Sequence, residues 1–168
     1  MRALFVVVSG APGSGKSTIA RELAPRLDLP LFMKDTIKEA LGEVLGAEDV
    51  AASKRLGAAT MEALVALARD NDGGVFESTW VPALARRQLA GIEPIVEVLC
   101  DVPLDVSMAR YEARVGTRHA VHFDAQQQLD PAGWRERATA IDGGWPVIRV
   151  DTTRPVDIDA LVQRILDA

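Results

Sequence analysis

The run from Gly10 to Ser17 has the composition and spacing of a loop that binds phosphate groups. It matches the pattern G-x-x-x-x-G-K-[ST] through Gly10, Gly15, Lys16 and Ser17. Glycines allow backbone amides to turn inward around an anion. The lysine reaches the β- and γ-phosphates, and the serine hydroxyl is a ligand for Mg²⁺. We therefore expect a nucleoside triphosphate, most simply ATP, to be held by Gly10, Ala11, Pro12, Gly13, Ser14, Gly15, Lys16, Ser17 and Thr18.

The elements predicted around this loop are those that the motif requires. Residues 3–9 form a continuous apolar run rich in β-branched residues, which predicts a strand buried on both faces. Residues 15–27 carry apolar side chains at four-residue spacing, which predicts a helix. The positive end of that helix would face the same anion as the loop.

The rest of the chain alternates in the same way between short apolar runs and helical patterns. Further strands are predicted at 31–33, 75–77, 95–100 and 147–151. Further helices are predicted at 36–45, 49–70, 82–90, 104–115, 131–140 and 158–166, with a turn at 71–74 and a loop at 118–128. This order predicts an α/β fold of three layers, in which helices flank a five-stranded parallel sheet.

Composition and charge limit the class of protein. A length of 168 residues suits one domain, 1–168, with its own core. The single cysteine, Cys100, excludes an internal disulfide, and a buried thiol in a cytoplasmic protein is the simplest expectation. No apolar run approaches the length of a membrane span. The net charge of −5 argues against nucleic-acid binding over the whole surface, but leaves room for a local basic groove.

Asp35 follows the short strand predicted at 31–33, so it should lie at the same sheet edge as the phosphate loop. A carboxylate there can accept the proton of an attacking hydroxyl group. A structural role is the alternative, because the helix dipole favours an acid near a helix N-terminus. Asp35 also precedes a possible capping box, in which Glu39 comes three residues after Thr36.

Glu77 ends the strand predicted at 75–77, and a carboxylate directly after a buried strand needs a partner. Magnesium or the acceptor could provide one. The alternative is a solvated carboxylate at the strand end. Trp80 lies three residues further on, where packing in the core is expected more than contact with an acceptor.

Arg110, Arg114 and Arg118 recur every four residues, which places the first two on one face of the predicted helix. Phosphoryl transfer needs positive charge against the equatorial oxygens of the moving group. A solvated basic face is the alternative. His119 and His122 follow, and a chain with one cysteine is not expected to use them for zinc.

The segments VSGAPGSGKSTIARELA and LFMKDTIKEAL, in this order and at this distance, resemble P-loop kinases related to polynucleotide kinase, zeta toxins and chloramphenicol phosphotransferase. Small proteins described as AAA-type ATP-binding share the layout. The resemblance implies a P-loop NTPase fold with an arginine-bearing lid near 110–128. It also implies that Asp35 is the base, that Arg114 and Arg118 clamp the triphosphate with Arg110 in third place, and that the turn after Asp151 borders the adenine. Glu77 departs from the aspartate that many of these proteins carry at a position serving magnesium or the acceptor.

Three hypotheses of function follow. The first is a kinase that moves the γ-phosphoryl of ATP to a hydroxyl of a small molecule, with Asp35 as base and with Lys16, Arg114 and Arg118 as the positive charges. Ser17 would be the main magnesium ligand, and the protein would be a monomer or homodimer without a membrane partner. The second is transfer to the 5′-hydroxyl of a nucleic acid, against which the net charge and the few aromatics weigh. The third is a slowly hydrolysing nucleotide switch, whose D-x-x-G strand end is absent at 75–77.

Overall fold

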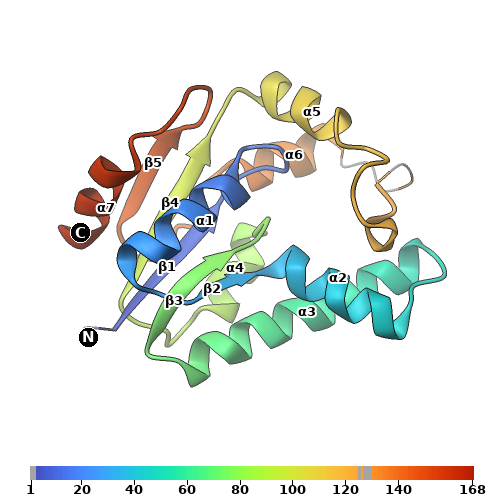
Figure 1. Ribbon diagram of the computed structural model, residues 1–168, viewed down its shortest axis with the longest axis horizontal. Coiled ribbons are helices and arrows are strands. Elements are labelled where there is room, and N and C mark those ends of the chain that lie inside the picture. The colour runs from blue at the N-terminus through green and yellow to red at the C-terminus, as the bar shows by residue number, and fades with distance from the viewer. Residues whose placement is uncertain (1–2, 125, 127–129) are drawn as a thin grey trace.

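The five predicted strands form one parallel sheet (Figure 1). The computed structural model describes residues 3–124, 126 and 130–168. The strands are β1 Leu4–Ser9, β2 Leu31–Met33, β3 Gly73–Glu77, β4 Ile95–Asp101 and β5 Val147–Asp151. The helices are α1 Lys16–Leu27, α2 Lys34–Leu45, α3 Val50–Asp70, α4 Pro82–Gln88, α5 Leu104–Glu112, α6 Pro131–Arg137 and α7 Ile158–Leu166, with a 3-10 turn, η1, at Ala120–His122.

The strand order β2-β3-β1-β4-β5 places β1, and therefore the phosphate loop, at the centre of the sheet. Val8 lies opposite Glu77 on one side and Val98 on the other. Since all five strands are parallel, their carboxyl ends share one edge. The sequence prediction of a common edge for the loop, Asp35 and Glu77 is therefore confirmed.

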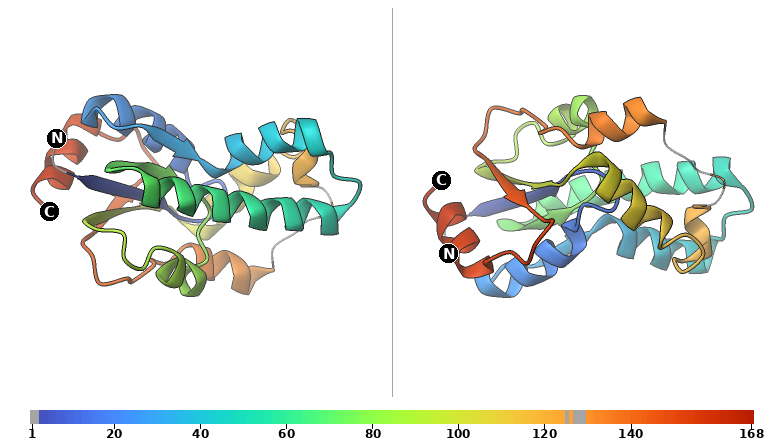
Figure 2. Two further views of the ribbon diagram at one scale, coloured as in Figure 1. Left: turned by 90° about the horizontal axis from the view of Figure 1, so that it is seen from below. Right: turned by 90° about the horizontal axis from the view of Figure 1, so that it is seen from above.

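Helices cover both faces of the sheet, as predicted (Figure 2). On one face, α1 and α7 pack on the strands through apolar residues such as Ile19, Leu23 and Leu161. On the other face, α3 and α4 contribute Leu64, Val65 and Leu89 to a second core. The sheet is buried on both sides, which explains the continuous apolar runs of β1 and β4. Cys100 lies in the first core, as predicted, and burial raises the pKa of its thiol to about 12.

Two predicted boundaries were wrong for physical reasons. Helix α2 begins at Lys34, and no side chain caps it, so the capping box from Thr36 does not form. Strand β3 begins at Gly73 within the predicted turn, because Gly73 pairs with Leu4. A Cβ at Gly73 would lie 2.6 Å from the Leu4 carbonyl oxygen, so only glycine allows this close approach.

The region beyond β4 also differs from the prediction. Helix α5 ends at Glu112, so Arg114 lies in the turn after the helix rather than on its face. The predicted loop at 118–128 contains η1, whereas Ala125, Gln127 and Gln128 of the expected lid lie outside the described residues. Helices α2 and α3 extend past the sheet edge, and η1 packs against both. Within the described chain, no helix is long and apolar enough to span a membrane.

Candidate active site

The phosphate loop has the backbone geometry that its glycines predict. Gly13 and Gly15 adopt φ values of +79° and +86°, a region that disfavours residues with a side chain. A Cβ at Gly13 would collide with the Ser107 carbonyl oxygen of α5. The loop therefore packs closely against α5 as well as against β4. Thr152, after β5, adds a third support because its Oγ1 donates to the Ser14 carbonyl at 2.7 Å.

Lys16 is buried at the start of α1, with 6% of its surface exposed. Its Nζ donates to the Ala11 carbonyl oxygen at 2.8 Å, so the side chain curls over the loop. Desolvation lowers the pKa of Lys16, although the nearby carboxylates of Glu77 and Asp35 oppose this effect. A phosphate oxygen placed over the same loop would stabilise this ammonium group, which is held out of water with one neutral partner.

Ser17 and Glu77, the two predicted magnesium ligands, are in contact. The Ser17 hydroxyl lies close enough to Glu77 to lower the pKa of that carboxyl. Burial raises the pKa of Glu77, and Lys16 partly offsets this effect. A hydroxyl beside a carboxylate supplies the hard oxygen donors that Mg²⁺ takes, with phosphate oxygens and water completing its shell. Among the described residues no group of three or more His, Cys, Asp or Glu could hold a metal.

One cavity of about 440 Å³ joins the phosphate loop to the elements beyond it. Lys16 and Ser17 line it on the side of β1 and α1, and Glu77 lines it at the end of β3. Asp35 lines it from the start of α2. The other charged and aromatic residues that line it are Lys34, Lys38, Lys54, Tyr111, Arg114, Arg118, His122, Asp124 and Arg137.

Asp35 is ionised and surrounded by positive charge. Burial raises its pKa, but the charges of Lys34 and Arg118 outweigh that effect and leave the pKa below its usual value. The Lys34 Nζ lies 3.5 Å from Asp35 Oδ1. A carboxylate that is ionised at neutral pH and faces the same cavity as Lys16 has the protonation state that a general base needs.

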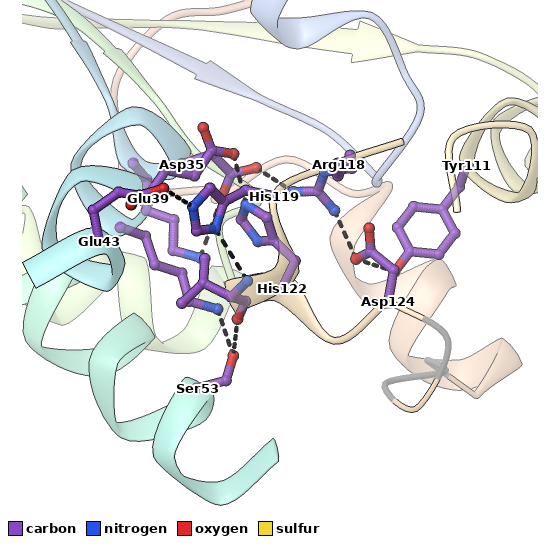
Figure 3. A network of polar contacts seen from close by, with 12 residues as sticks. Asp35, Glu39, Glu43, Ser53, Tyr111, Arg118, His119, His122 and Asp124 are labelled. Carbon is purple, nitrogen blue, oxygen red and sulfur yellow. Dashed lines mark hydrogen bonds and ion pairs between the residues drawn. The ribbon is translucent and has the colours of Figure 1, made fainter. Parts of the chain in front are cut away.

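Arg118 links Asp35 to Asp124 (Figure 3). Its Nη2 lies 2.6 Å from Asp35 Oδ2, and its Nη1 lies 2.8 Å from Asp124 Oδ1. Asp124 is held in turn by the Tyr111 hydroxyl at 3.0 Å. The guanidinium group therefore bridges two carboxylates from segments far apart in the sequence.

His119 and His122 face carboxylates of α2 (Figure 3). His119 Nε2 lies 2.6 Å from Glu43 Oε1, and His122 Nε2 lies 2.8 Å from Glu39 Oε1. Glu39 thus contacts His122 of η1 instead of capping its own helix. Between the two histidines, the Val121 carbonyl accepts a hydrogen bond from Ser53 Oγ at 2.6 Å. These contacts fix η1 against both α2 and α3.

The other predicted side chains take different places. Arg114 lines the cavity, and within the described part of the chain its side chain has no hydrogen bond or ion pair. Arg110 is not among the cavity-lining residues, and its guanidinium donates two hydrogen bonds of 3.1 Å to the Thr152 carbonyl. It anchors the turn after β5, so its contact with phosphate stays a prediction. Trp80 is buried against α3 and α4, in agreement with a packing role.

Sequence reasoning missed several residues that line the cavity. Lys34 and Lys38 flank Asp35 four residues apart on α2, a spacing that places both on one helix face. That signal was present in the sequence, but nothing in the sequence said which face meets the cavity. Lys54 and Arg137 come from α3 and α6, and their position depends on how these helices pack.

Comparison with known proteins agrees with this geometry. A family model described as an AAA domain matches residues 5–137. The thymidylate kinase of Nitrobacter winogradskyi is 28% identical over 200 aligned residues, covering 98% of this chain and 86% of that protein. The shikimate kinase of Rhodococcus jostii is 31% identical over 115 residues, covering 68% of this chain and 66% of that protein.

Solved structures share the fold over the full length. A protein assigned as a kinase in Chloroflexus aurantiacus j-10-fl superposes with a TM-score of 0.82 at 25% identity, covering 99% of this chain and 98% of that one. The shikimate kinase of Bacteroides thetaiotaomicron has a TM-score of 0.62 at 17% identity, over 98% and 97% of the two chains, a likeness of fold alone. The family match over residues 5–137 is the decisive finding: the chain belongs to the AAA domain family and has the fold of small P-loop kinases.

Proposed function

We propose that this protein is an ATP-dependent kinase that transfers the γ-phosphoryl group to a hydroxyl of a small acceptor. The observation that carries the proposal is one cavity lined by Lys16 and Ser17 on one side and by Asp35 on the other. A phosphate donor and a base for an acceptor can therefore meet in the same space. The relatives named above are kinases, which supports phosphotransfer in general.

The proposed step follows from the positions of these groups. The acceptor oxygen forms a bond to the γ-phosphorus while the bond from that phosphorus to the β,γ-bridging oxygen breaks, so ADP leaves with the electron pair. The hydroxyl proton passes to a carboxylate oxygen of Asp35. Lys16 and Arg114 stabilise the negative charge on the transferred group and the leaving group. Ser17, with Glu77 beside it, would hold magnesium, which would supply positive charge that neutralises part of the charge of the phosphates.

Asp35 favours a hydroxyl over a phosphate oxygen as the acceptor atom. A phosphate oxygen is ionised at neutral pH and needs no base, whereas a hydroxyl must lose a proton during transfer. The relatives include both a thymidylate kinase and a shikimate kinase, so relationship alone does not choose between these acceptor atoms. The charge and position of Asp35 support the hydroxyl.

Arg118 must leave Asp35 before that carboxylate can receive a proton. In the structure Arg118 holds both Asp35 and Asp124, so the lid contact occupies the base. We propose that the acceptor hydroxyl replaces the guanidinium at Asp35, and that Arg118 then turns to the transferred phosphoryl group. This change would couple acceptor binding to the completion of the charge clamp.

A screen of hydroxyl compounds tests the proposal. Purified protein is incubated with γ-labelled ATP, Mg²⁺ and sets of nucleosides, sugars, polyols and 5′-hydroxyl oligonucleotides, and labelled products are separated. The proposal expects a labelled phosphomonoester that the Asp35→Asn variant does not form. The exposed substitution Asp167→Asn, at the end of α7, is the matched control for loss of one carboxylate. Hydrolysis of ATP without any labelled acceptor would favour the switch hypothesis instead.

A further inference from the structure

All four lysines of this chain line the same cavity. The sequence contains Lys16, Lys34, Lys38 and Lys54, and the remaining basic residues are arginines. Lys16 belongs to the phosphate loop, but the other three come from α2 and α3, around Asp35. A lysine is a compact, mobile charge suited to a small anion. The question is what the three lysines outside the loop serve.

Lys34 and Lys38 bring their ammonium groups together over Gly57 of α3. A Cβ at Gly57 would lie 3.9 Å from Lys34 Nζ and 4.0 Å from Lys38 Nζ, so both charges occupy one small space beside the helix. Gly57 therefore marks the point where the two ammonium groups lie against α3. Lys54 lies one turn earlier on α3 and lines the same cavity with an exposed side chain.

The positive charges of Lys34 and Lys38 are only partly neutralised by the carboxylates nearby. Lys38 is 5% exposed, and its Nζ donates to a neutral partner, the Ser53 hydroxyl, at 2.8 Å. Lys34 contacts Asp35 at 3.5 Å, but Asp35 is already held by Arg118 at 2.6 Å. Burial and the charge of Lys34 lower the pKa of Lys38 to about 8. A buried ammonium group and a neighbouring one that repels it are stabilised by an anion placed between them.

The charge of the whole cavity also favours a bound anion. Its lining contains seven lysines and arginines but three carboxylates, Asp35, Glu77 and Asp124. MgATP brings about two net negative charges, which leaves positive charge unmatched on the acceptor side. This excess stands in a chain whose net charge is −5, so it is local to the cavity rather than a general property of the surface.

We infer that the acceptor carries an anionic group, a phosphate or a carboxylate, in addition to the hydroxyl that is phosphorylated. Lys34 and Lys38 bind this group beside Gly57, and Lys54 contacts it from the rim. The hydroxyl then lies at Asp35, one residue along α2 from Lys34. The inference rests on the proposed function and narrows its substrate class. A small anion is favoured over a nucleic-acid strand because the lysines converge inside one cavity of about 440 Å³ and the chain is acidic.

The first test measures anion binding without any turnover. A non-hydrolysable ATP analogue with Mg²⁺ fills the phosphate loop, and inorganic phosphate or acetate is then titrated while the melting temperature and amide NMR shifts are followed. We expect saturable binding that shifts residues around Gly57, and a loss of affinity of about tenfold or more in Lys38→Met and in Lys34→Met. Lys38→Arg should retain binding, and Arg55→Gln, an exposed neighbour of Lys54, is the matched control. Absence of saturable binding in the wild type would overturn the inference, whatever the protein does to ATP.

The second test uses matched acceptors. Glycerol, glycerol 3-phosphate and glycerate are compared, as are nucleosides with their monophosphates and a 5′-hydroxyl oligonucleotide. We expect anionic members of a set to be used at least about tenfold better in kcat/KM, and the phosphate and carboxylate arms show which anion is bound. Lys34→Met and Lys38→Met should raise the acceptor KM and leave the ATP KM within about twofold. Equal or better use of the neutral members, or preference for the oligonucleotide, would contradict the inference that the acceptor is a small anion. If no compound is phosphorylated but anion binding persists, the kinase proposal fails and the anion site stands.

Discussion

Asp35 and Arg118 form an ion pair of 2.6 Å although 83 residues separate them in the chain. The predicted base and a predicted phosphate-binding arginine thus form a direct ion pair. Asp124 holds the other side of the same guanidinium at 2.8 Å. This relationship makes the roles of the two aspartates separable by experiment.

Replacing Asp35 with Asn should lower the rate of phosphoryl transfer by about 10²- to 10⁴-fold, because the hydroxyl proton loses its acceptor. The affinity for ATP should change little, since Asp35 lies on the acceptor side of the cavity. The turnover rate with an identified acceptor and the ATP dissociation constant from calorimetry give the two values. Asp124→Asn is the matched comparison, because it also removes a partner of Arg118 but keeps the base. Transfer at the wild-type rate in Asp35→Asn would exclude Asp35 as the base.

Arg114 and Arg118 should respond differently to alanine. Arg114 has no hydrogen bond or ion pair within the described chain, so Arg114→Ala should reduce the turnover rate by about tenfold or more without changing stability. Arg118→Ala also breaks two partly buried ion pairs and should lower the free energy of unfolding by about 1 kcal/mol. Urea unfolding and steady-state kinetics measure both effects. Arg87→Ala, exposed on α4, controls for loss of one guanidinium. Unchanged turnover in both cavity variants would remove the lid arginines from the mechanism.

The buried charge of Lys16 is expected to lower the stability of the fold, and the same charge is expected to be required for ATP binding. Its ammonium is buried with one carbonyl partner, and desolvation lowers its pKa. Lys16→Ala should weaken ATP binding by about 100-fold, equivalent to about 2.7 kcal/mol. Lys16→Met should weaken ATP binding similarly but match or exceed the wild type in melting temperature, because no charge is then buried. Arg21→Ala, exposed on α1, is the control. Normal ATP affinity in Lys16→Met would contradict the assignment of the phosphate loop.

Glu77 should set the magnesium requirement. If its carboxylate and Ser17 share the ion, Glu77→Gln should raise the Mg²⁺ concentration for half-maximal activity by about tenfold. Saturating Mg²⁺ should then restore most of the activity. Titration of activity with Mg²⁺ at fixed ATP measures this, with the exposed Glu62→Gln on α3 as the control. An unchanged Mg²⁺ requirement would leave Glu77 with a packing or acceptor role.

The use of an anionic acceptor should fall as the pH rises through about 8, where Lys38 loses its charge. The folded pKa of Lys38 lies below its ordinary value of 10.5, so between these values the unfolded chain binds more protons and this group stabilises the fold as the pH rises. The loss is therefore one of binding and not of folding. The charged and polar groups that act on or contact Lys38 are Lys34, Asp35, Ser53, Arg118, His122 and Asp124.

The pH dependence of kcat/KM for the acceptor measures this effect. Lys38→Arg should move the decline to higher pH because a guanidinium stays charged. The ATP KM should show no matching change, since Lys16 holds the triphosphate. A decline that is the same in Lys38→Arg would assign the titration to another group.

The sequence predicted the fold well because its signals are local. Apolar runs and helical spacing located all five strands and the main helices, and their alternation implied the parallel sheet. The errors arose where a distant contact decided a boundary. Gly73 joins β3 because it pairs with Leu4, and Glu39 turns to His122 instead of capping α2. Neither partner is visible in the local pattern.

The positions of the phosphate loop and of Asp35 could be predicted from the sequence alone. Backbone geometry defines the loop, and the carboxyl ends of parallel strands lie at one edge of the sheet. Tertiary structure decided the rest of the site. The packing of α3 and η1 against α2 brings Lys38, Ser53 and η1 close to Asp35, and it pairs Arg118 with Asp35 and Asp124. Charge pairing and desolvation act through space, so the basic character of the acceptor side emerged only when segments distant in sequence were brought together.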